Sequence, residues 1–96
     1  MNYGLNQQVV DSIIDLSKEF QLSKTILFGS RARGDYAQRS DIDLAIMGGN
    51  TMEFQLSIDE SIHTLLSFDV VVLDKPLQQQ LRESIEQEGI ILYEKN

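Results

Sequence analysis

The spacing of apolar residues predicts three amphipathic helices along the chain. Hydrophobic side chains recur at intervals near 3.6 residues over 6–20 and 50–66, and again after Pro76. The three stripes consist of Val9, Val10, Ile13, Leu16 and Phe20, then Phe54, Ile58, Ile62 and Leu65, then Leu77, Leu81 and Ile85. Asn50 has capping-box spacing to Glu53, Pro76 suits a first helical turn, and Gly89 suits a helix C-terminus.

Short apolar runs between these helices predict strands. They cover 25–28, 41–47 and 68–73, and 90–93 suits an additional edge strand. In the second run the alternation places Ile42, Leu44 and Ile46 on one face and Asp41 and Asp43 on the other. The order predicts an α/β (α+β) fold, in which a small mixed sheet of 3–4 strands is flanked by helices.

The lengths of the connections predict how the strands pair. The first two strands are joined by 30–40, which is too short for a parallel crossover, so they should be antiparallel neighbours. The next connection, 48–67, contains a whole helix and suits a crossover between parallel strands. Gly29 would then lie beside Asp41, and Asp69 would join both acids of the second strand at one end of the sheet.

Three carboxylates at one end of a sheet repel one another unless a cation neutralises them. Mg²⁺ is the natural candidate, because it prefers oxygen ligands and leaves positions open for phosphate oxygens. Gly29 permits close approach of a ligand to the backbone, and Ser30 is expected to cap a helical turn over 30–33 that Gly34 ends. These residues together predict a site for a metal-bound phosphate compound.

The spacing of these residues resembles that of a known superfamily. Gly29 and Ser30 are followed after ten residues by Asp41 and Asp43, and Asp69 lies on a later strand. This pattern resembles the nucleotidyltransferase superfamily related to DNA polymerase β, and in particular its minimal nucleotidyltransferase branch. The resemblance implies the polymerase β-like nucleotidyltransferase fold, in a single domain over 1–96.

The resemblance also implies roles for the site residues. Asp41 and Asp43 would hold two Mg²⁺ ions with ATP as substrate. Asp69 would complete the metal site and would act as, or orient, the base that deprotonates the acceptor hydroxyl. Gly29 and Ser30 would bind the β- and γ-phosphates, and pyrophosphate would leave.

Two arginines follow the glycine–serine pair and have two interpretations. The stretch that contains Arg31 and Arg33 is typical of the minimal branch, which implies cofactor-binding contacts with phosphate. The alternative is that Arg33 pairs with an acid of the domain and fixes the turn.

Composition narrows the classes of function. The 96 residues carry a net charge of −7, which argues against direct nucleic-acid binding. The absence of cysteine excludes disulfides and thiolate metal sites and is compatible with the cytoplasm. No apolar run reaches the length of a membrane span, and the N-terminus does not resemble a signal peptide.

The short chain leaves no room for an acceptor-binding domain, so the acceptor is expected on a partner. The resemblance implies an antitoxin that transfers AMP to a hydroxyl, expected to be a tyrosine, of a HEPN-domain toxin in a type VII-like toxin–antitoxin pair. One alternative is a binding module that blocks its partner by occlusion without catalysis. Another is nucleotidylation of a small molecule such as an aminoglycoside.

Overall fold

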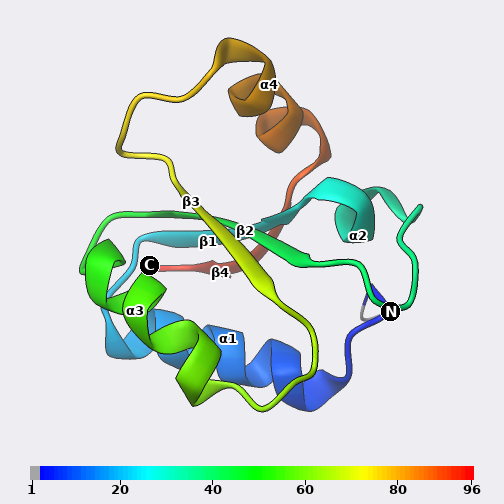
Figure 1. The fold of residues 1–96 in the computed structure, drawn as a ribbon. Coiled ribbons are helices and arrows are strands. Elements are labelled where there is room, and N and C mark those ends of the chain that lie inside the picture. Colours follow the sequence, from blue (N-terminus) through cyan, green and yellow to red (C-terminus); the bar gives the residue numbers. More distant parts are fainter. Residues whose placement is uncertain (1–2) are drawn as a thin grey trace.

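The computed structural model describes residues 3–96 and shows a four-stranded mixed sheet flanked by helices (Figure 1). In chain order the elements are α1 (Gln7–Glu19), β1 (Lys24–Phe28), α2 (Gly29–Arg33), β2 (Ile42–Met47), α3 (Thr51–Ser61), β3 (Phe68–Val72), α4 (Gln79–Glu88) and β4 (Ile90–Glu94). The predicted fold class is confirmed, and the predicted edge strand is present as β4.

The strands are ordered β3-β2-β1-β4 across the sheet. β1 pairs antiparallel with β2 on one side and with β4 on the other. β2 and β3 pair in parallel, joined by the crossover that contains α3. Both pairings predicted from connection length are confirmed, and they bring the beginnings of β2 and β3 to the same edge of the sheet.

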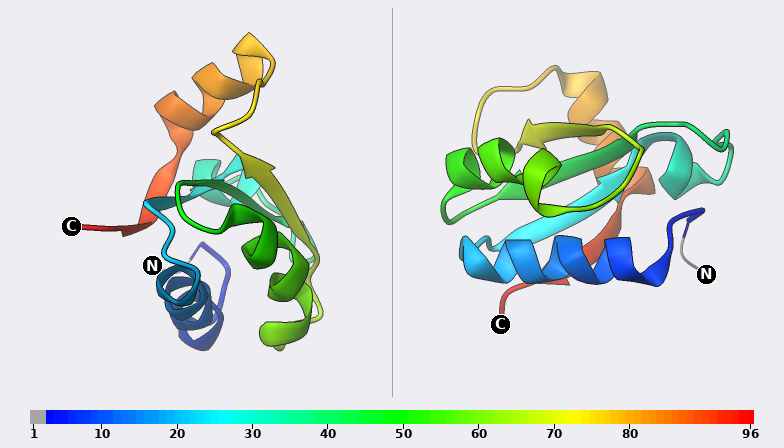
Figure 2. Two further views of the ribbon diagram at one scale, coloured as in Figure 1. Left: turned by 90° about the vertical axis from the view of Figure 1, so that its left-hand side faces the viewer. Right: turned by 60° about the horizontal axis from the view of Figure 1, so that its bottom comes forward.

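Two helical layers cover the sheet. Figure 2 shows α1 and α3 on one side and α4 on the other. A hydrophobic cluster lies on each face of the sheet, and alternating residues of β2 contribute to both. Ile42, Leu44 and Ile46 are fully buried in the larger cluster, with α1 and α3. Ala45 packs with Phe28 and Ile85 in the smaller cluster, against α4. The apolar faces therefore fix the register of β2, and with it the positions of the acids at its beginning.

Asparagine side chains cap two helices, and of these caps the one at Asn50 was predicted from the sequence. The Asn6 side chain accepts a hydrogen bond from the Val9 backbone N–H at 2.8 Å, and Asn50 accepts one from that of Glu53 at 3.3 Å. These caps satisfy N–H groups that have no partner within the helix.

Three local features differ from the predicted ones. α3 ends at Ser61 instead of reaching 66, because Ile62 leaves the helix in an extended conformation and is buried. Pro76 lies in the loop before α4, which begins only at Gln79. Ser30 does not cap α2: the helix begins one residue earlier, and its first turn has no side-chain cap. The predicted end of α2 is confirmed, since Gly34 adopts the left-handed conformation at its C-cap.

Within residues 3–96, no helix combines the length and the apolar character needed to cross a membrane.

Candidate active site at the beginnings of β2 and β3

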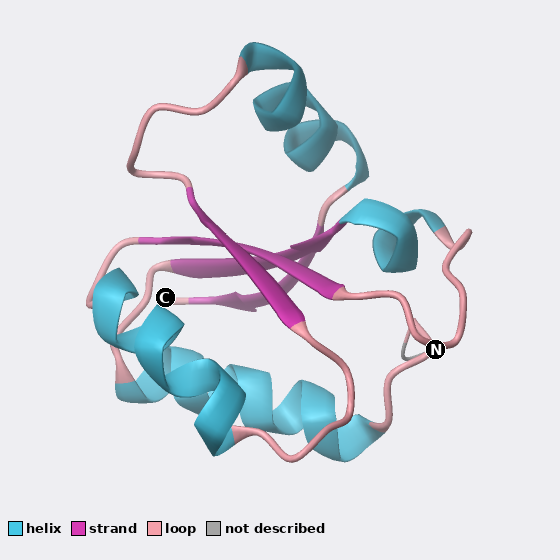
Figure 3. Cartoon of the chain, in the orientation of Figure 1, coloured by secondary structure: helices cyan, strands magenta, loops and turns pink. Residues whose placement is uncertain are grey.

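The candidate site lies where β2 and β3 begin, beside the end of β1 (Figure 3). Asp43 and Asp69 are direct partners in the parallel register, so neighbouring strands place two acids side by side. Asp41 is exposed and lies one residue before β2. The topology thus brings the backbone positions of all three predicted acids to one edge.

The side chains of these acids do not yet form a metal site. Within residues 3–96, no three histidine, aspartate or glutamate side chains surround one point as ligands of a metal ion. Like charges on adjacent strands repel, which opposes convergence of these carboxylates in the absence of a cation. The prediction that three carboxylates converge is therefore met by the backbone and not by the side chains.

The electrostatics of Asp43 reflect this crowding. Partial burial raises the pKa of Asp43, and the nearby charges of Asp69 and Asp41 raise it further. The positive charges of Arg33 and Arg31 oppose that shift without cancelling it. Carboxylate oxygens with excess negative charge are the kind of donor that Mg²⁺ prefers, so the residue types at this edge suit that ion, whereas their side chains do not surround one point.

Gly29 lies against the carboxylate of Asp43. The glycine adopts a positive φ of 76°, and a Cβ atom there would overlap Asp43 Oδ2. Sequence reasoning placed Gly29 beside Asp41, but in the observed register Phe28 faces Asp43. A larger residue at position 29 would therefore displace the more buried of the two β2 acids.

Arg33 follows the structural alternative among its two interpretations. It is partly exposed, and its Nε lies 3.2 Å from an Asp35 carboxylate oxygen and 3.7 Å from one of Glu88. The second contact links α2 to α4. The positive charge of Arg33 also acts to lower the pKa of Asp43, so Arg33 lies close enough to affect the acids of the site. Contact between Arg33 and phosphate stays a prediction.

Arg31 occupies a position unlike that expected of a phosphate ligand. Its side chain is buried, with 1% of the residue surface exposed. The guanidinium donates hydrogen bonds to the main-chain carbonyls of Tyr3, Gln38 and Ser40. Contact with a phosphate would require some of these bonds to break.

A pocket beside Asp41 was not foreseen. It has a volume of about 340 Å³ and is lined by Gln38, Arg39, Asp41, Leu65, Leu66 and Ser67. Leu65 was predicted to lie on the apolar stripe of α3, but it is fully exposed because the helix ends four residues earlier. The sequence carries no stop signal at Ser61 that would have revealed this.

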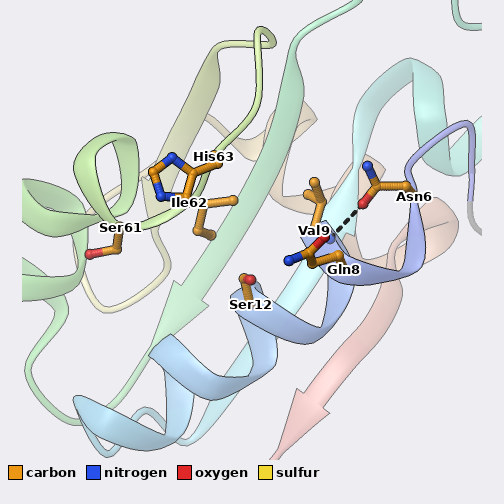
Figure 4. A pocket seen from close by; sticks show the side chains of 7 residues that line it. All are labelled: Asn6, Gln8, Val9, Ser12, Ser61, Ile62 and His63. Atoms are coloured by element: carbon orange, nitrogen blue, oxygen red, sulfur yellow. Dashed lines mark hydrogen bonds between the residues drawn. The ribbon is translucent and has the colours of Figure 1, made fainter.

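A second, smaller pocket lies away from these acids, between the beginning of α1 and the end of α3 (Figure 4). It has a volume of about 80 Å³, and Asn6, Ser12 and His63 are among its lining residues. The Asn6 amide already serves as the α1 cap, and His63 is exposed. None of the residues that line this pocket belongs to the candidate site around Asp43 and Asp69.

Comparison with known proteins identifies the family. Residues 11–96 match the family model described as polymerase beta, nucleotidyltransferase. The chain belongs to this nucleotidyltransferase family. Over 82 residues this nucleotidyltransferase is also 35% identical to MJ0604, a candidate protein adenylyltransferase of Methanocaldococcus jannaschii, covering 76% of this chain and 80% of the relative.

Solved structures share the fold of this nucleotidyltransferase. A MntA–HpeT toxin–antitoxin structure matches with a TM-score of 0.70 and 24% identity, covering 95% of this chain and 74% of that one. A toxin–antitoxin structure with AMP-PNP has a TM-score of 0.68 and 23% identity, with coverages of 90% and 73%. A minimal nucleotidyltransferase structure also has a TM-score of 0.68 and 23% identity, with coverages of 94% and 95%.

Proposed function

We propose that this nucleotidyltransferase transfers AMP from ATP to a tyrosine hydroxyl of a partner HEPN-domain toxin, and so acts as the antitoxin of the pair in the cytoplasm. The observation that carries the proposal is the pairing of Asp43 with Asp69 beside Gly29. Supporting it are the relative that is a candidate protein adenylyltransferase and the fold shared with a toxin–antitoxin structure that contains AMP-PNP.

Asp41, Asp43 and Asp69 would hold two Mg²⁺ ions, which supply charge neutralisation for the triphosphate. The excess negative charge around Asp43 supports this assignment, because a cation relieves it. Gly29 and Ser30 would bind the β- and γ-phosphates. The absence of a Cβ at Gly29 lets this turn lie directly against the Asp43 carboxylate, and so beside the cation that Asp43 would hold, and Ser30 would add a hydroxyl donor in the same turn.

The transfer itself is a substitution at the α-phosphorus of ATP. A bond forms between this phosphorus and the acceptor oxygen, and the bond to the bridging oxygen of the β-phosphate breaks. Pyrophosphate leaves with the electron pair of that bond. Asp69, exposed at the beginning of β3, would accept the proton of the acceptor hydroxyl or would orient the base that accepts it.

The pocket beside Asp41 is where we place the acceptor side chain. Leu65 offers a fully exposed apolar surface there, and Asp41 is one of the polar residues that line the same pocket. An aromatic ring with a terminal hydroxyl suits a pocket with one apolar wall and one polar end.

The test mixes the chain with the product of its neighbouring gene, the expected partner, together with ATP and Mg²⁺, and measures the mass of that partner. A gain of one or more AMP units is expected with the native chain and with Asp15→Asn, an exposed acid of α1. The gain should disappear with Asp41→Asn and with Asp43→Asn. No gain with any nucleotide would reject the proposal, and protection of cells by Asp43→Asn would favour occlusion.

A further inference from the structure

Arg31 is the only charged residue buried within residues 3–96. A buried guanidinium is costly unless all its donors have acceptors. It lies on α2, next to Ser30, with only 1% of its surface exposed. Its burial therefore has to be compensated by the hydrogen bonds that it makes.

The acceptors of Arg31 are main-chain carbonyls. Nε and Nη2 donate to the Ser40 oxygen at 3.2 and 2.9 Å, and Nη2 also donates to the Gln38 oxygen at 3.2 Å. Nη1 donates to the Tyr3 oxygen at 3.1 Å. The Tyr36 ring lies over the guanidinium, with its centroid 5.0 Å from Cζ. One side chain thus joins the segment near the N-terminus to the loop before β2.

This loop ends directly at Asp41. Ser40 is held from one side by Arg31, and on the other side the Ile42 N–H donates to the Ser67 carbonyl at 2.9 Å, next to β3. Asp41 itself is exposed and lies between these two attachments. Its backbone is therefore fixed at both neighbours while its carboxylate stays accessible.

We propose that Arg31 is a positioning residue, which fixes the backbone at Gln38–Ser40 and thereby the placement of the Asp41 carboxylate for binding a divalent cation. The role in cation binding rests on the proposed function, whereas the role in fixing the loop does not. Arginine suits this task because its planar fork directs donors to several carbonyls at once, and a lysine ammonium does not reproduce that geometry.

The loop carries its own reporters for a test by hydrogen exchange. The Ser40 N–H donates to the Ala37 carbonyl at 3.1 Å, and the Ala37 N–H donates to Ser40 Oγ at 2.8 Å. With Arg31→Lys, we expect exchange at these two amides to become at least about tenfold faster, while the amides of β1 keep their protection. Unchanged exchange at both amides would overturn the proposal.

Two further variants keep this test decisive. Gly4→Ala keeps the arginine at position 31 but disturbs its surroundings. The new Cβ would lie 2.7 Å from Arg31 Nη1 and would also overlap the Tyr36 ring. It should accelerate exchange at the same two amides, even if the lysine variant fails to fold. Arg82→Lys is the matched control, because Arg82 also donates to main-chain carbonyls, those of Leu73 and Lys75, in a different loop. It should leave exchange at Ala37 and Ser40 unchanged.

Cation binding gives a second readout that does not depend on catalysis. Arg31→Lys should bind Mn²⁺ about tenfold more weakly than the native chain in a titration without nucleotide. In the transfer assay it should need more Mg²⁺ for half-maximal rate, with the KM for ATP at saturating Mg²⁺ unchanged. A raised KM for ATP with native Mn²⁺ affinity would instead assign Arg31 to phosphate and overturn the proposal. If the native chain transfers nothing, the proposed function fails, and the exchange rates still decide whether Arg31 fixes the loop.

Discussion

Asp43 and Asp69 are direct neighbours across the parallel pairing of β2 and β3, at the edge where both strands begin. Two acids facing each other on adjacent strands destabilise a sheet, because like charges in register repel. The destabilisation is local, since Asp43 is only partly buried and Asp69 is exposed. A divalent cation would convert this repulsion into shared coordination, which leads to predictions for stability as well as for activity.

Replacing Gly29 should disrupt the site more than it disrupts the fold. In Gly29→Ala the new Cβ overlaps the Asp43 carboxylate, and the residue must keep a positive φ. We expect transfer to fall by about 100-fold, since a misplaced ligand of this kind has effects of that order. Initial rates of AMP transfer at saturating ATP and Mg²⁺ would measure this.

Gly34→Ala is the matched control for the glycine variant. Gly34 also has a positive φ, of 93°, but a Cβ there would meet no atom within 4 Å. Both variants should therefore lose about 1–2 kcal/mol of unfolding free energy from backbone strain. Only Gly29→Ala should lose most of its activity, and equal activity losses in the two would contradict the role given to Gly29.

Asp43→Asn should separate activity from stability. Removal of the carboxylate should reduce transfer by at least about 100-fold, because the amide is a poor metal ligand. In the absence of divalent cations the same variant should be more stable than the native chain, with a melting temperature higher by about a few degrees. A melting temperature below the native value would contradict the electrostatics assigned to this edge.

The contribution of Asp43 to stability should decrease as the pH rises, because its pKa is raised in the folded state. Burial and the charges of Asp69 and Asp41 raise the pKa of Asp43 in the folded state, so the folded chain binds more protons than the unfolded chain. This contribution is therefore largest below about pH 4, the ordinary range of an aspartate, and is lost as the pH rises through the folded pKa. Urea unfolding without metal measures this contribution. The unfolding free energy of the native chain minus that of Asp43→Asn should fall as the pH rises through the folded pKa of Asp43.

Added Mg²⁺ should restore the unfolding free energy that the ionised Asp43 carboxylate costs at neutral pH. The native chain should gain melting temperature with Mg²⁺ concentration, because an ion that binds only the folded state stabilises it by mass action. Asp43→Asn should gain much less. Equal gains in both would place the cation elsewhere.

Arg33→Gln tests whether this side chain contacts phosphate in addition to its ion pairs. Its partners Asp35 and Glu88 are at the surface, so the melting temperature should change little. We expect the KM for ATP to rise several-fold with kcat nearly unchanged, because a positive charge near the triphosphate is lost. Lys18→Gln, at an exposed position of α1, is the control and should change neither quantity.

The buried hydroxyl pair should influence stability without influencing the site. Ser17 Oγ lies 2.7 Å from Thr25 Oγ1 and donates to the Ile13 carbonyl at 2.8 Å, joining α1 to β1. Ser17→Ala should cost about 1–3 kcal/mol, because it leaves the Thr25 hydroxyl without this partner in the interior. The double variant with Thr25→Val should cost less than the sum of the single costs, and the KM for ATP should stay at the native value.

Much of the fold follows from local patterns that the sequence displays directly. The periodic apolar stripe predicts α1, which begins directly after Asn6. The alternation in β2 assigns Ile42 to the core and Asp43 to the other face. Connection lengths decide the antiparallel and parallel pairings. The C-terminal end of α3 could not be predicted in this way, because burial of Ile62 against the core outweighs the continuing helical pattern.

The residue types of the site were determined by the sequence alone, in the spacing of Gly29, Asp41, Asp43 and Asp69. The tertiary structure decided the contacts among them, since only strand register shows that Asp43 faces Asp69 and that Gly29 lies against Asp43. It also decided the position of Arg31, whose acceptors include a carbonyl 28 residues away. Hydrogen bonds to main-chain oxygens leave no trace in side-chain patterns, because every residue carries such an acceptor.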